Sequence, residues 1–139
     1  MPVRSKQLEN IVRRMERIPV EVRQAIKPVL QTSGDEMQRM MRELAPKDTH
    51  ALEKSIAVTV GGNMTPPYSQ PGGSTLVPEN AVFITAGDEK VRYAHLVEYG
   101  TVVAKAKPYF WPAYRLLKNR ASNRLKRAMA KAIRETWDK

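Results

Sequence analysis

Apolar residues recur at helical spacing through the first 44 residues of this 139-residue chain, and this repeat constrains the fold more than any other feature. Pro19 fits the first turn of a second helical segment, and Pro46 ends the stripe. Pro28 lies inside the stripe and predicts a kink, because proline removes a backbone hydrogen bond and crowds the preceding turn. The repeat therefore predicts a long, kinked N-terminal helix. Its apolar face includes Ile11, Val12, Ile18, Val22, Ile26, Val29, Met37, Met40 and Leu44.

Three methionines, Met37, Met40 and Met41, lie close together near the end of this stripe. Methionine fills irregular gaps in cores and also adapts to partners on exposed surfaces. Both interpretations stay open at this point, and we favour core packing because the spacing follows the apolar stripe.

The pattern changes after Leu52 to two short β-branched runs, 55–60 and 81–85, which predict two strands. The 20 residues between them, 61–80, hold four of the seven glycines, four of the ten prolines and a single charged residue, Glu79. We expect no packed core from that composition. A connection of this length is typically functional or disordered. The sequence therefore predicts a hairpin with a long mobile arm, and a tolerated insertion without a role is the alternative.

A last helix is predicted from Pro112 onward, with an apolar stripe on one face and cations on the other. The stripe, which we expect to pack against the N-terminal helix, consists of Leu117, Ala121, Leu125, Ala128, Ala132 and Ile133.

The positive charge of the chain is concentrated in this last helix. Residues 104–139 contain six Lys and five Arg against two acidic residues, a net charge of +9, which leaves +1 of the total +10 for residues 1–103. Such asymmetry predicts a polyanionic neighbour, either nucleic acid or an acidic protein surface, and the alternative is a solvated helix face. The candidate interaction residues, expected to face solvent in the monomer, are Arg120, Arg124, Arg127, Lys131 and Arg134.

Length and composition limit the remaining choices. The chain fits one domain, residues 1–139, of the α+β class: a long kinked N-terminal helix and a basic C-terminal helix packed on a small, mostly antiparallel sheet with a flexible arm at 61–80. With no cysteine there is no disulfide, thiolate nucleophile or thiolate zinc site, and two histidines are too few for a dedicated metal site. We expect no cofactor and no catalysis. No apolar stretch approaches 18 residues and the start lacks a secretory segment, so we expect no membrane contact and synthesis in the cytoplasm.

Six aromatic residues lie within the 22 residues 93–114. In the first half, Tyr93, Val97 and Gly100 follow helical spacing, which favours a short helix capped by Gly100, although a strand stays open. Glu98 is expected to accept hydrogen bonds from the following loop or from a neighbouring subunit. The competing interpretation pairs it with His95 as a metal or acid–base site.

The second half holds the remaining aromatic residues, Tyr109, Phe110, Trp111 and Tyr114. Rings beside basic residues can form a stacking platform for nucleic acid. We favour core or subunit packing, because two prolines at 108 and 112 fix this segment at the start of a helix.

This region resembles the small tail-completion, or head–tail joining, proteins of long-tailed bacteriophages, the Hong Kong-type gene-product-ten family. That family reads roughly Tyr-Ala-x-x-x-Glu-x-Gly-Thr, then a loop, then Pro-Phe-x-x-Pro-Ala. The likeness is carried by Tyr93, Ala94, Glu98, Gly100, Thr101, Pro108, Phe110 (shifted by one), Pro112 and Ala113.

Residues 45–56 are similar to a second motif of the same family, Ala-Pro-x-Asp-Thr-Gly-x-Leu-x-x-Ser-Ile. Here the likeness is carried by Ala45, Pro46, Asp48, Thr49, Leu52, Ser55 and Ile56. His50 stands where the family has glycine, and histidine tolerates the left-handed backbone region better than most residues.

The resemblance implies a structural virion protein of the phage neck, without enzymatic activity. It implies a ring, expected to be six-fold, that completes the tail and joins it to the capsid connector. The implied partners are further copies of the chain, the head connector or stopper, tail-terminator or tail-tube proteins, and genomic DNA in the channel. The protein would be made in the host bacterial cytoplasm and reside in the virion neck. The alternative is a small nucleic-acid-binding domain that uses the basic C-terminal helix.

Overall fold

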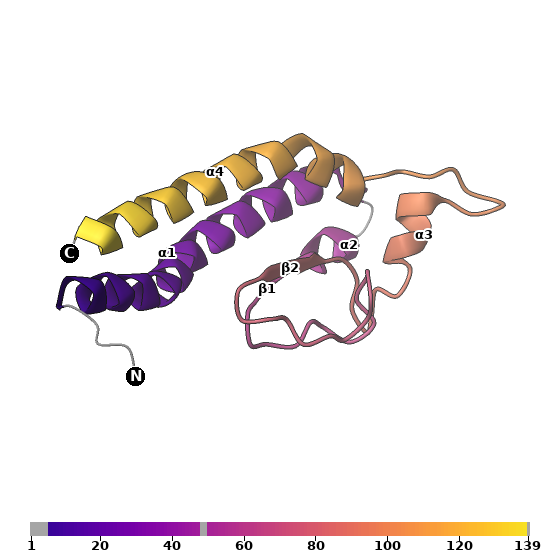
Figure 1. Cartoon of the computed structure of the whole chain (residues 1–139). Coiled ribbons are helices and arrows are strands. Elements are labelled where there is room, and N and C mark those ends of the chain that lie inside the picture. Colours follow the sequence, from indigo (N-terminus) through magenta and orange to yellow (C-terminus); the bar gives the residue numbers. More distant parts are fainter. Residues whose placement is uncertain (1–5, 48–49, 139) are drawn as a thin grey trace.

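The computed structural model describes residues 6–47 and 50–138 of the chain. The elements are α1 (Lys6–Leu44), α2 (Ala51–Lys54), β1 (Ala57–Val60), β2 (Val82–Thr85), α3 (Ala94–Tyr99) and α4 (Phe110–Asp138). This order confirms the predicted α+β class. In Figure 1, α1 and α4 lie side by side in opposite directions, with the sheet, α2 and α3 near the C-terminal end of α1. Within the described ranges, no helix is both long and apolar enough to cross a membrane.

Helix α1 continues through both of its internal prolines, Pro19 and Pro28. The prediction that Pro19 starts a separate helical segment is therefore wrong. Both proline rings are exposed, so neither disturbs the packed face, and the helix accommodates them by bending, which Figure 1 shows in its N-terminal half. Met37 and Met41 are buried in the core, which confirms the packing interpretation of these methionines.

The two predicted strands form the sheet. β1 pairs with β2 in an antiparallel arrangement, with Ala57 opposite Thr85 and Val60 opposite Val82. Gly34 of α1 lies against this sheet, where an added Cβ would come within 2.9 Å of Val58 Cγ1 and 3.0 Å of Val82 Cγ1. Glycine inside a helix is intrinsically unfavourable, and here it permits close packing of the sheet on α1.

The segment 61–80 folds back on itself between the two strands. The Thr65 amide donates to the Thr75 carbonyl (2.9 Å), and the Thr75 amide donates to the Thr65 hydroxyl (2.7 Å). Thr65, Ser69 and Val77 are buried, so the expectation that this composition supplies no packed interior is wrong. Hydrogen bonds within the segment hold it together where few large apolar side chains are present. They favour an ordered loop, and the mobility of the arm in a free subunit stays a prediction.

Helix α4 packs along α1 (Figure 1), and Leu117 and Ala121 of its apolar stripe lie against the core that contains Met37 and Met41 of α1, as predicted. Leu117, Ala121 and Ala128 are half-buried and Ala132 is buried, whereas Ile133 is 41% exposed and lies at the margin of the stripe. The helix begins at Phe110, which places Pro112 in its first turn, where a missing amide costs little.

Candidate assembly interface

Glu98 joins α3 to the start of α4. The side chain is 6% exposed, and its Oε2 accepts hydrogen bonds from the amides of Tyr109 (2.8 Å) and Phe110 (2.9 Å). Its Oε1 accepts a third from the amide of Trp111 (3.0 Å). A carboxylate at this position satisfies amides that have no partner within the helix and interacts favourably with the helix dipole. The expectation that Glu98 accepts hydrogen bonds from the segment that follows it is confirmed, and in the described residues no hydrogen bond or ion pair joins Glu98 to His95.

Gly100 ends α3 and starts the loop between α3 and α4. Its φ is +79°, and an added Cβ would lie 2.7 Å from the amide nitrogen of Ala106. Both the backbone conformation and the close approach of the returning chain therefore require glycine. Thr101 then closes a tight turn, because its amide donates to the Ala104 carbonyl (2.9 Å) and its hydroxyl accepts from the Ala104 amide (3.0 Å).

The loop that Gly100 starts projects from the body of the molecule beyond α3 (Figure 1). At its tip, Val102 is 105% and Val103 94% exposed, so these side chains pack against none of the described residues. The second half of the loop is joined to α3 by a hydrogen bond from the Lys107 amide to the Val97 carbonyl (2.8 Å). Pro108 is exposed between this contact and the buried Tyr109. The sequence pattern indicated a connector here, and two adjacent valines between a glycine and a proline were the signal for an exposed apolar tip.

The aromatic residues divide between the core and the surface. Tyr109 and Phe110 are buried, and the Tyr109 hydroxyl donates to the Ala94 carbonyl (3.1 Å). Burial, together with the nearby Glu98 carboxylate, raises the pKa of Tyr109. Trp111 is half-buried and donates its indole N–H to the Tyr99 hydroxyl (2.7 Å). The packing interpretation is thus confirmed for Tyr109 and Phe110.

Residues from both sequence motifs meet beside the loop. Pro46 from the upstream motif and Tyr93 and Thr101 from the downstream motif line one hollow of about 230 Å³. Leu52 is buried, and the Ser55 hydroxyl donates to the Leu52 carbonyl (2.6 Å) and accepts from the Gly87 amide (3.0 Å). Ser55 of the upstream motif therefore binds the segment between β2 and α3. Asp48 and Thr49 of this motif lie outside the described residues.

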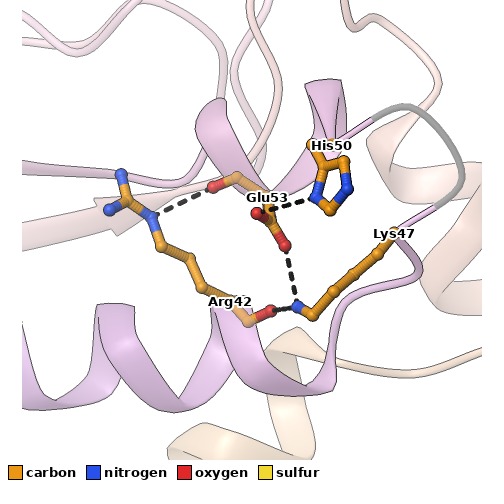
Figure 2. A network of polar contacts seen from close by, with 4 residues as sticks. All are labelled: Arg42, Lys47, His50 and Glu53. Carbon is orange, nitrogen blue, oxygen red and sulfur yellow. Dashed lines mark hydrogen bonds and ion pairs between the residues drawn. The ribbon is translucent and has the colours of Figure 1, made fainter.

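A polar network fixes the connection between α1 and α2 (Figure 2). Glu53 is its centre: Oε2 lies 2.7 Å from Lys47 Nζ, and Oε1 lies 3.1 Å from His50 Nδ1. The Lys47 ammonium, and then the His50 ring, lower the pKa of Glu53 from its ordinary value. Lys47 also donates to the Arg42 carbonyl, and Arg42 Nε donates to the Glu53 carbonyl (3.1 Å). His50 has a φ of +62°, so the position where the family has glycine does adopt the left-handed conformation.

The basic residues of α4 behave in two ways. Arg124 donates to Glu36 Oε2 (2.9 Å) and to the Ser33 hydroxyl (3.0 Å), and Arg120 Nε lies 3.3 Å from Glu36 Oε1. The expectation that Arg124 faces solvent is wrong, because its guanidinium group turns toward α1 and binds the Glu36 carboxylate. These contacts, the Arg124 hydrogen bond foremost, lower the pKa of Glu36.

The C-terminal half of α4 keeps the predicted exposed charge. Arg127 and Arg134 are exposed, and Lys131 makes a long ion pair with Glu135 (3.9 Å) in which both side chains are mostly exposed. Such pairs contribute little to stability. This part of the helix therefore presents cations that the fold does not need.

An apolar groove of about 280 Å³ lies between β2 and α4, and no sequence pattern indicated it. Its walls are β2, Met41 of α1, Pro71, and Phe110, Trp111 and Tyr114 of α4. β2 pairs with β1 on one side, and in the described residues no strand occupies the side that borders the groove. Thr85 lies in this wall, and its buried hydroxyl has no hydrogen-bond partner in the described part of the chain.

The site contains little that could perform chemistry. Among residues 6–47 and 50–138, no three His, Cys, Asp or Glu side chains are grouped as metal ligands. The carboxylates of Glu98, Glu36 and Glu53 are each held by hydrogen bonds to neighbouring groups. The arrangement suits contact with macromolecules: a braced apolar projection, an apolar groove and an exposed basic helix.

Comparison with protein families matches residues 9–100 to the HK97-gp10-like family, described as "Bacteriophage HK97-gp10, putative tail-component". The match includes the upstream motif and ends at Gly100, immediately before the projecting loop. No curated protein and no solved structure matches the chain.

Proposed function

Because the chain belongs to the HK97-gp10-like family of phage tail components, we propose that it is a structural protein of the phage neck, where it forms a ring that completes the tail and joins it to the capsid connector. Its partners are further copies of itself, the head connector or stopper, and tail-terminator or tail-tube proteins. A ring around the genome channel has six-fold symmetry in this proposal.

One observation carries the proposal: the loop between α3 and α4 places Val102 and Val103 in solvent, while Glu98 fixes its base. Monomeric soluble proteins seldom maintain a projecting apolar tip, and such features mark interaction sites. The base of the loop is held by three charge-assisted hydrogen bonds to one buried carboxylate, and two hydrogen bonds between Thr101 and Ala104 close the turn at its tip. A preorganised projection reduces the entropic cost of association.

The cations in the C-terminal half of α4 supply a second surface. Arg127, Lys131 and Arg134 are exposed, and in the part of the chain that the structure describes their one ion pair is the long contact between Lys131 and Glu135. We assign them to an acidic neighbouring protein or to DNA that passes through the channel. A dedicated nucleic-acid-binding domain is the competing function, and it requires tight binding of the free protein to DNA that weakens steeply with salt.

The test is electron microscopy of lysates from a phage or prophage lacking the gene for this chain. The proposal expects filled heads and separate tails, with joining restored when the purified chain is added. Joined, infectious particles without the chain contradict it. Titration of DNA into the free protein at two salt concentrations separates the competing function, which alone requires tight, salt-sensitive binding.

A further inference from the structure

The apolar tip at Val102 and Val103 has no packing partner among residues 6–47 and 50–138. Its near-complete exposure shows that the tip does not fold onto the groove of its own subunit. The turn closed by Thr101 and Ala104 holds the two side chains at the apex. Burial of apolar surface in a partner is the favourable change available to such a tip.

The groove beside β2 lacks a matching occupant. Its walls are predominantly apolar, with Phe110, Trp111 and Tyr114 on one side and β2 on the other. Thr85 contributes a buried hydroxyl without a hydrogen-bond partner in the described residues.

We infer that the Val102–Val103 tip of one subunit inserts into the β2–α4 groove of a second copy of the chain. The valines cover the aromatic wall of the groove. Beyond the bridge between Gln70 and Ala86, no strand of the described residues pairs with the side of β2 away from β1, so its backbone groups can bind the incoming segment. This inference rests on the proposed ring and names the contact that builds it.

The geometry of such a contact agrees with a ring. The projecting loop and the groove are different surfaces of one subunit, so each copy uses its loop on one neighbour and its groove on the other. A contact between unlike surfaces propagates from copy to copy, and it ends only when the rotation closes. A two-fold dimer, in contrast, uses the same surface on both subunits.

Cysteine crosslinking tests this contact directly, because the chain contains no cysteine. The test variant carries Val103→Cys and Tyr114→Cys in one full-length chain, which is assembled into tails and oxidised. Tyr114 lines the groove. The matched control carries Val103→Cys with Leu116→Cys. Leu116 is 67% exposed on the same helix, and two residues of helix turn it roughly 200° away from Tyr114.

We expect the test variant to give a ladder of disulfide-linked oligomers that stops at the number of subunits in the ring, whereas the control stays monomeric on a non-reducing gel. Disulfides form only when the two Cα atoms come within about 7 Å, so the readout is specific for the insertion. Equal ladders in both variants, or none in either, overturn the inference.

A second readout separates this inference from the ring itself. Lysine-directed crosslinking of wild-type tails reports neighbouring copies without reference to the groove. Oligomers in that experiment without disulfides in the test variant overturn the loop insertion and leave the ring standing. If neither chemistry links copies, the ring proposal fails as well.

Substitution of the tip provides an independent measurement. Because both valines are almost fully exposed, Val102→Asp with Val103→Asp leaves the melting profile unchanged. We expect self-association of this variant to weaken roughly 100-fold or more, since two buried apolar side chains are replaced by charges. Leu116→Asp is the control and keeps wild-type association. Wild-type association of the folded tip variant contradicts the insertion.

Discussion

Replacement of Glu98 tests how the junction between α3 and α4 is held. The carboxylate accepts hydrogen bonds from three consecutive amides, those of Tyr109, Phe110 and Trp111. In Glu98→Ala, the two fully buried amides lose their partner, and each unsatisfied buried donor costs about 1–3 kcal/mol. Trp111 is half-buried, so water partly satisfies its amide. We expect the unfolding free energy to fall by about 4 kcal/mol, including the lost interaction with the helix dipole.

Glu98→Gln gives a graded result from the same geometry. Glutamine keeps the size of the side chain and one acceptor oxygen, but its amide group faces at least one of the three N–H donors, and the charge is lost. We expect about half the effect of alanine, roughly 2 kcal/mol. The control is Glu135→Ala on the exposed face of α4, where the 3.9 Å pair with Lys131 predicts a loss below about 0.5 kcal/mol.

Urea unfolding monitored by far-UV circular dichroism and tryptophan fluorescence measures these differences. We expect the wild type and the Glu135→Ala variant to be the most stable and nearly equal. Glu98→Gln is less stable than both, and Glu98→Ala is the least stable. An alanine variant within about 1 kcal/mol of wild type, close to the error of the extrapolation, refutes the argument that this carboxylate secures the helix start.

Three further predictions follow from packing, the loop and the ion pair. Phe110→Ala empties a buried site in the core and lowers stability by roughly 3–5 kcal/mol in thermal or urea unfolding, and an unchanged melting profile contradicts its burial. Deletion of residues 64–75 removes the internal hydrogen bonds of the 61–80 segment, and we expect it to abolish assembly. Limited proteolysis of the intact free chain distinguishes the two states of this segment: resistance indicates the ordered loop that the hydrogen bonds favour, and cleavage indicates a mobile arm. Arg124→Ala lowers stability by about 1–2 kcal/mol while Arg127→Ala changes it little, and equal losses contradict the asymmetry. Arg124 lowers the pKa of Glu36, so the ion pair contributes its full stabilisation at pH values above 4.5, the ordinary pKa of the carboxyl group. This stabilisation is lost as the pH falls through the lowered pKa of the folded state. Arg124→Ala is therefore expected to lose less stability than the wild type on acidification.

The sequence predicted those features that local chemistry determines. Gly100 indicated a helix end, and it has a positive φ; the two β-branched runs became β1 and β2; and the carboxylate of Glu98 caps the segment that follows it. Each rests on residues within about a dozen positions of one another or on a pattern with a fixed period. The same reasoning found the apolar stripe of α4, because its period is that of the helix.

The features that the sequence did not predict depend on contacts between distant segments. Arg124 pairs with Glu36, 88 residues away, and charge patterning along α4 alone gives no reason to single it out. The internal hydrogen bonds of 61–80 join backbone and hydroxyl groups, and composition alone does not indicate them. The groove exists because β2 and the first turns of α4 lie at a distance set by α1 and by Glu98.

The ion pairs of Glu36 determine which cations of α4 remain available to a partner. Arg120 and Arg124 are partly neutralised by α1, so the uncommitted charge lies in the C-terminal half of the helix, at Arg127, Lys131 and Arg134. In Figure 1 this half of α4 lies at the opposite end of the molecule from the projecting loop. The apolar contact and the cationic contact are therefore on separate surfaces, and occupation of one does not block the other. A subunit arranged in this way can contact its neighbours through the loop and groove while it presents the basic helix to a different, acidic partner.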